Sequence, residues 1–134
     1  MNDIKLMNKA ADNIRILAAS MVEKAKSGHP GGAMGGADFI NVLFSEFLVY
    51  DPKNPTWEGR DRYFQDPGHM SPMLYSVLAL TGKFTIDELK QFRQWGSVTP
   101  GHPEVNVMRG IENTSGPLGQ GHTYAVGAAI AAKF

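Results

Sequence analysis

Each of the four histidines in this 134-residue chain directly follows a glycine, and this pairing limits how the chain can fold. With 15 glycines in the chain, a random sequence of this composition would show the same pairing about once in several thousand. Glycine permits backbone conformations and close approaches that other residues do not, and histidine donates, accepts or carries charge near neutral pH. The sequence therefore predicts loops that bring histidine side chains to one polar ligand. The four pairs are Gly28-His29, Gly68-His69, Gly101-His102 and Gly121-His122.

Composition excludes several classes of partner. The formal net charge is zero and the chain has no basic stripe, so we expect no electrostatic binding to nucleic acid or to an anionic membrane. The chain contains no cysteine, which excludes disulfides and thiolate metal sites and favours an intracellular location. The N-terminus has no signal-peptide core, and no apolar run is long enough to span a bilayer. The sequence predicts a soluble, cytoplasmic protein.

Apolar residues at three- and four-residue steps predict three amphipathic helices, over residues 3–26, 40–48 and 70–78. Thr85 and Glu88 have the spacing of a capping box, which predicts a short helix before Gly96. The alanine-rich end is predicted to be helical from residue 125, and it has no stop signal, so we expect the chain to continue in its parent protein. We expect the stripes at 40–48 and 70–78 to need partners outside the chain, and hence exposed apolar surface and self-association.

Strand signals are few. Residues 62–65 form a short strand candidate ended by Asp66-Pro67-Gly68, and a second candidate lies near residues 110–114.

The loop of residues 27–32, Ser-Gly-His-Pro-Gly-Gly, separates two predicted helices and is either a ligand-binding loop or a plain helix-to-helix turn. Pro67-Gly68-His69 lies at a strand-to-helix junction, where free N–H groups attract anions, although His69 is equally suited to act as a cap. His102 lies in a turn made rigid by Pro100 and Pro103, and this spacing alone favours an exposed turn histidine.

Residues 116–121, Gly-Pro-Leu-Gly-Gln-Gly, precede the last helix and suit either close approach to a ligand or tight packing of a helix start. They match neither a dinucleotide-binding fingerprint nor a phosphate-binding Walker motif. His122 is expected to cap or pack. A metal site made of the four histidines is an open alternative, but no two of them have the spacing of a helical ligand pair. No G-x-S-x-G motif supports a nucleophilic triad.

Taken in order, these motifs make the chain similar to the N-terminal part of the transketolase family of thiamine-diphosphate enzymes. The similarity lies in residues 27–32, 51–55, 60–63, 68–69, 74–76, 99–104 and 116–121. It implies an α/β fold class, with residues 1–134 as the helix-rich N-terminal portion of a parallel-sheet thiamine-diphosphate-binding domain that holds few short strands. The rest of this cofactor (pyrophosphate-binding) domain and the later domains would lie outside the chain.

The resemblance implies a homodimeric transferase of the pentose phosphate pathway, which moves a two-carbon ketol unit from a ketose phosphate to an aldose phosphate. His69 would be a ligand of the cofactor diphosphate, and Gly116, Pro117 and Leu118 would lie against the aminopyrimidine and thiazolium rings. His29 and His102 would be the catalytic, substrate-binding residues, contacting donor hydroxyls and the charge that develops on the carbonyl oxygen.

The resemblance also implies Mg²⁺, whose ligands are expected downstream because no Gly-Asp-Gly motif occurs here. We therefore expect residues 1–134 alone to be inactive. Asp66 stands where many members have a serine, and a carboxylate there is compatible with a diphosphate only if it points away. Two alternatives stay open: another thiamine-diphosphate ketol transferase or one subunit of a split transketolase, and a non-catalytic anion-binding domain.

Overall fold

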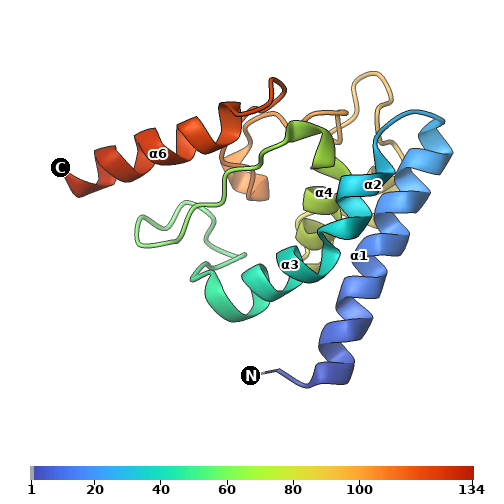
Figure 1. Ribbon diagram of the computed structural model, residues 1–134, viewed down its shortest axis with the longest axis horizontal. Helices are drawn as coiled ribbons and strands as arrows, with labels where there is room; N and C mark the ends of the chain where they lie inside the picture. The colour runs from blue at the N-terminus through green and yellow to red at the C-terminus, as the bar shows by residue number, and fades with distance from the viewer. Residues whose placement is uncertain (1) are drawn as a thin grey trace.

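The computed structural model describes residues 2–134, so Met1 lies outside the described part of the chain. Helices α1, α2 and α3 gather around α4, whereas α6 extends away from this group towards the C-terminus (Figure 1). The elements are α1 (Ile4–Ala25), α2 (Pro30–Gly35), α3 (Ala37–Val42), the π-helical turn η1 (Leu43–Phe47), the 3₁₀ turn η2 (Gly68–Met70), α4 (Ser71–Leu80), α5 (Ile86–Leu89), the 3₁₀ turn η3 (Val107–Arg109) and α6 (Gln120–Lys133).

Helix α1 confirms the prediction for residues 3–26. Its N-cap is Asp3, whose carboxylate accepts from the backbone N–H groups of Lys5 and Leu6. Ala11, Ile14, Ala18 and Met21 recur at three- and four-residue steps and are buried, so they form the single face that packs on the other helices.

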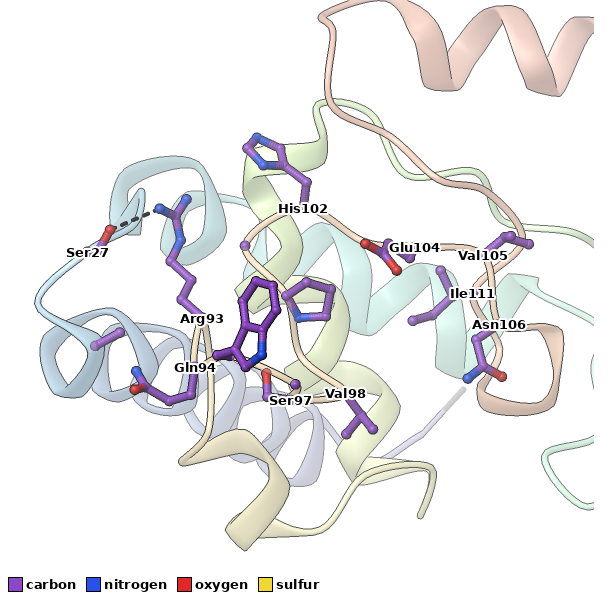
Figure 2. Close-up of a pocket in the computed structure, with 15 residues that line it drawn as sticks. Ser27, Arg93, Gln94, Ser97, Val98, His102, Glu104, Val105, Asn106 and Ile111 are labelled. Atoms are coloured by element: carbon purple, nitrogen blue, oxygen red, sulfur yellow. Dashed lines mark hydrogen bonds between the residues drawn. The ribbon is translucent and has the colours of Figure 1, made fainter.

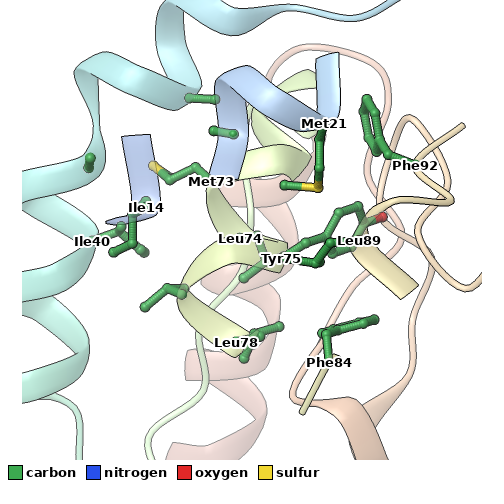
Figure 3. Packing of buried hydrophobic residues seen from close by; sticks show 14 of the residues in the cluster. Ile14, Met21, Ile40, Met73, Leu74, Tyr75, Leu78, Phe84, Leu89 and Phe92 are labelled. Atoms are coloured by element: carbon green, nitrogen blue, oxygen red, sulfur yellow. The ribbon is translucent and has the colours of Figure 1, made fainter. Parts of the chain in front are cut away.

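Helix α4 is the centre of the core (Figure 3). The prediction of a helix at 70–78 is confirmed, but the expected single apolar stripe is wrong, because every residue from 71 to 78 is buried. Tyr75 lies at the middle of an aromatic cluster, with its ring centroid 5.4 Å from that of Phe84 and 6.3 Å from that of Phe92. A helix covered on all sides shows weak amphipathic periodicity, which explains the difference.

The stripe at 40–48 also finds partners within the chain. Ile40 and Phe44 are buried in the same cluster as Ile14 of α1 and Leu78 of α4. The expectation of outside partners is therefore wrong for residues 70–78 and for the buried part of 40–48, whereas it stays a prediction for Phe47, which is exposed. The exposed apolar surface includes Val126, Ile130 and Phe134 on and beside α6. Self-association stays a prediction.

The second predicted helix begins earlier and is interrupted. Pro30 occupies the first turn of α2, where its missing N–H costs nothing, so the glycine-rich loop already becomes helical there. Gly36 then separates α2 from α3, and the helix continues as the π-helical turn η1. The capping box at Thr85 and Glu88 is confirmed: Thr85 Oγ1 accepts from the N–H of Glu88, and the Glu88 carboxylate accepts from the N–H of Thr85.

Both strand predictions are wrong for residues 2–134. Residues 62–65 form no ladder; the backbone N–H of Gln65 donates to the side chain of Asn113, and its carbonyl accepts from the same amide. The second candidate is reduced to an isolated antiparallel bridge between Asn106 and Ile111. A strand needs a neighbouring strand to bind its backbone groups, and at Gln65 the side-chain amide of Asn113 binds them instead. The expectation of a helix-rich portion with few strands is confirmed.

Helix α6 begins at Gln120, five residues before the predicted start at 125. Across residues 2–134, the structure shows no helix with both the length and the apolar character needed to cross a membrane.

Candidate functional site

Three of the four histidines lie together. The ring centroids of His29 and His69 are 4.6 Å apart, and the charges of both rings act on His102. His29 is the residue just before α2, His69 lies in η2 just before α4, and His102 lies in the loop after α5. His29 and His102 are exposed and His69 is half-buried, so each of the three imidazoles is at least partly accessible.

The first two turns of α4 position two of these histidines. His69 lies two residues before the helix, and the hydroxyl groups of Ser71 and Tyr75 hold the loop that carries His102. Ser71 Oγ donates to the carbonyl of Gly101 over 2.7 Å, and Tyr75 Oη donates to the carbonyl of Pro100 over 2.8 Å. Since both residues are buried, these bonds attach the loop to buried side chains of α4.

Arg93 links the loop of His29 to the loop of His102. Its guanidinium donates to Ser27 Oγ over 2.9 Å, and its backbone N–H donates to the carbonyl of Thr99 over 3.0 Å. A Cβ atom on Gly101 would lie 2.6 Å from Arg93 Nε, so the glycine before His102 admits the guanidinium. The sequence analysis did not single out Arg93, which has no motif around it; its positive φ of 61° is a strained conformation that only the structure shows.

The segment before α6 reaches the same place. A Cβ atom on Gly68 would lie 2.3 Å from the carbonyl oxygen of Ser115 and 3.1 Å from the nitrogen of Gly116. The N–H of Ser115 donates to the carbonyl of Pro103, one residue after His102. The backbone of Gly116 therefore lies beside the residue that precedes His69. Pro117 and Leu118 follow Gly116 and are exposed.

His122 is separate from the three-histidine cluster. Its Nδ1 lies 3.1 Å from the Asp66 carboxylate, and its side chain is 71% exposed. The expectation that His122 packs is wrong, because its side chain is mostly exposed; its imidazole contacts the carboxylate that accepts from the N–H of Gly119. Within residues 2–134 the structure forms no group of three or more His, Asp or Glu side chains that could hold a metal ion, so the four-histidine metal site does not form there.

A hollow of about 940 Å³ lies beside the site, under the loop that joins Arg93 to His102 (Figure 2). Trp95, Val98 and Glu104 are part of its lining. The imidazole of His102 points away from Val98 and Glu104 (Figure 2). Of the three gathered histidines, His102 alone is part of this lining. The hollow is therefore a neighbour of the histidine cluster and not its centre.

Partial desolvation, followed by the positive charges of Arg93, His69 and His29, holds the pKa of His102 below its ordinary value of 6.5. The unfolded chain then binds this proton more readily than the folded one. Folding stability from His102 is complete above pH 6.5 and falls as the pH drops from there through the lower folded pKa.

We expect Arg93→Ala to raise the pKa of His102 towards 6.5, because it removes a neighbouring positive charge and part of the desolvation. Titration of the histidine ring signals by NMR measures this directly. Arg93→Lys keeps the charge and should leave the His102 pKa low. A His102 pKa that is the same in wild type and Arg93→Ala would contradict the assigned contact.

Residues 6–134 match the family model described as "Transketolase, thiamine diphosphate binding domain". Transketolase from Buchnera aphidicola subsp. Baizongia pistaciae is 54% identical over 129 residues, which are 96% of this chain and 19% of that protein. The crystal structure of transketolase from Campylobacter jejuni has a TM-score of 0.92 at 50% identity, covering 98% of this chain and 21% of that one. Pichia stipitis transketolase in complex with sedoheptulose 7-phosphate has a TM-score of 0.89 at 45% identity, and the match covers 93% of this chain and 18% of that one.

These matches and the gathered loops define a thiamine diphosphate binding domain. The chain belongs to the transketolase family, and it spans about a fifth of the length of the curated relatives it matches.

Proposed function

We propose that this chain forms part of the cofactor domain of a transketolase, which moves a two-carbon ketol unit from a ketose phosphate to an aldose phosphate with thiamine diphosphate. The observation that carries the proposal is the meeting of the His29, His69 and His102 loops beside the segment that starts at Gly116. Family membership supports the choice of cofactor, because the matched family is described by its thiamine diphosphate binding.

The residues at this place fit a ligand with an anionic part and an apolar ring. His69 lies at the start of α4, where an imidazole N–H and the positive end of the helix favour anionic oxygens. Leu118 is 75% exposed, which leaves an apolar side chain free to contact a ring. A Cβ atom on Gly116 would meet no atom of the described residues within 4 Å other than those of its chain neighbours, and Ser115 Oγ is buried without a hydrogen-bond partner among residues 2–134.

Thiamine diphosphate, when bound, supplies the electron sink that carbon–carbon bond cleavage next to a carbonyl requires. The chain's own residues would bind and orient. In this proposal His69 holds the diphosphate, and Gly116, Pro117 and Leu118 lie against the rings.

His29 and His102 would donate hydrogen bonds to donor-substrate hydroxyls and to the carbonyl oxygen as it gains charge. The lowered pKa of His102 suits this role, because a neutral imidazole at pH 7 can donate one N–H without bringing a full positive charge.

Mg²⁺, a homodimer, a cytoplasmic location and a role in the pentose phosphate pathway belong to the same proposal and rest on the family resemblance. The Mg²⁺ ligands are assigned to sequence beyond residue 134, so residues 1–134 alone are expected to be inactive.

The test is a transfer assay on the full-length protein that carries this chain, with thiamine diphosphate and Mg²⁺. Sedoheptulose 7-phosphate and glyceraldehyde 3-phosphate should yield two pentose phosphates, because one donor loses the two carbons that the acceptor gains. Omission of the cofactor should abolish the product. A folded protein that forms no pentose phosphates from this pair or from other ketose donors would contradict the proposal and favour a non-catalytic anion-binding domain.

A further inference from the structure

The start of α6 is held by a residue from a distant part of the chain. Its N-cap is Gly119, which has no side chain to offer and a φ of 92°. The Asp66 carboxylate accepts from the N–H of Gly119, with its two oxygens 3.1 and 3.3 Å from the nitrogen. An acidic group at a helix N-terminus is favourable, since it lies at the positive end of the helix dipole.

His122 completes this arrangement. It is the third residue of α6, the position from which a capping box sends a glutamate back to the N-cap N–H. In α6 the N–H of the N-cap residue donates to Asp66 and not to the third helical residue. Nδ1 of that third residue, His122, lies 3.1 Å from the same carboxylate. The Asp66 side chain is only 15% exposed, so its charge is committed to these two partners and faces away from solvent.

Backbone contacts on either side make the connection tight. A Cβ atom on Gly121 would lie 2.3 Å from the carbonyl oxygen of Gln65, and one on Gly68 would lie 2.3 Å from that of Ser115. The turn of residues 116–118 is between these two contacts. The segment with Asp66 leads directly into His69, so Asp66 joins the two segments that the proposed cofactor would touch.

We propose that Asp66, oriented by His122, is a positioning residue that sets the 116–118 turn against His69 before thiamine diphosphate binds. This inference rests on the proposed function and deepens it. Without the tether the turn would have to be ordered by the ligand itself, and that ordering weakens binding. Because Asp66 binds Gly119, the residue that directly follows the turn, and not the reacting atoms, cofactor affinity should change more than turnover at saturating cofactor.

The experiment compares four variants of the full-length protein by calorimetric titration with thiamine diphosphate and Mg²⁺, and by backbone hydrogen exchange. For Asp66→Ala we expect the dissociation constant to rise about tenfold and residues 116–122 to exchange about tenfold faster, with kcat at saturating cofactor within about threefold of wild type. Asp66→Asn keeps an oxygen acceptor for Gly119 and should stay within about threefold of wild type in affinity. His122→Ala removes one partner of the carboxylate, and its affinity for the cofactor should lie between those of Asp66→Ala and Asp66→Asn.

Asp12→Ala is the matched control, because Asp12 is an exposed carboxylate on α1 that pairs with Arg15. It should leave both measurements unchanged. The proposal is overturned if Asp66→Ala binds the cofactor and exchanges like wild type, or if Asp66→Asn loses as much as Asp66→Ala. A wild-type protein that binds no thiamine diphosphate would instead contradict the proposed function. The hydrogen-exchange data would still show whether Asp66 holds the turn.

Discussion

Replacing His29 or His102 by alanine in the full-length protein should lower the turnover of ketol transfer by about 100-fold each. This magnitude is typical for removal of one hydrogen-bond donor that stabilises charge developing on a carbonyl oxygen. Both side chains are exposed, His29 just before α2 and His102 within a loop, so the folded structure should tolerate the substitutions. Steady-state kinetics with saturating cofactor gives the effect, and thermal unfolding checks that the fold is unchanged.

The double variant sharpens this test. If both imidazoles act on one substrate, their effects should be strongly coupled, and the double variant should lose less than the product of the two single losses. His102→Asn keeps a donor and should recover part of the turnover. Turnover that falls by less than tenfold in both single variants would refute the donor role.

Adding one methyl group at Gly68 or Gly121 should destabilise the fold by about 3 kcal/mol, near the upper end for overpacking. In both places the new Cβ would lie 2.3 Å from a backbone carbonyl oxygen, which cannot turn aside as a flexible side chain can. The contact at Gly68 is with Ser115 and the contact at Gly121 is with Gln65, so both substitutions separate the same two segments. Urea denaturation of residues 1–134 measures the loss as a lower midpoint.

Gly127→Ala is the matched control on the same helix as Gly121. Apart from its chain neighbours and the backbone of its own helix, no atom of the described residues lies within 4 Å of its Cβ position, and alanine is a better helix former than glycine. We expect Gly127→Ala to stabilise residues 1–134 by about 1 kcal/mol. Equal effects at Gly121 and Gly127 would show that helix propensity, and not contact with Gln65, decides the result.

Sequence signals predicted a helix correctly where a single local feature determines it, such as one buried face or one capping box. The three- and four-residue spacing of Ile14, Ala18 and Met21 predicts α1 because a single face is buried. The Thr85–Glu88 capping box is a purely local bond pattern, and it forms as expected. Helix α4 was found, but its burial on every side was not, since that depends on how the other helices pack around it.

The errors come from features with distant causes. The strand expected at 62–65 depends on a neighbouring strand, and in its place Asn113 binds the backbone of Gln65. The Gly-His pairs predicted that all four histidine loops gather; this is confirmed for His29, His69 and His102 and wrong for His122. Arg93 and Asp66, which hold these loops to their neighbours, were not predicted as binding partners, because Ser27 and Gly119 are far from them in sequence.

The central claim is that the three histidine loops and the 116–118 turn surround one thiamine diphosphate. A crystal structure of the full-length protein with thiamine diphosphate and Mg²⁺ tests it most directly. The account predicts a diphosphate oxygen within hydrogen-bond distance of the His69 imidazole, with Leu118 against a cofactor ring and His29 and His102 facing the same space. A cofactor bound elsewhere, with His69 in contact with none of its atoms, would contradict it.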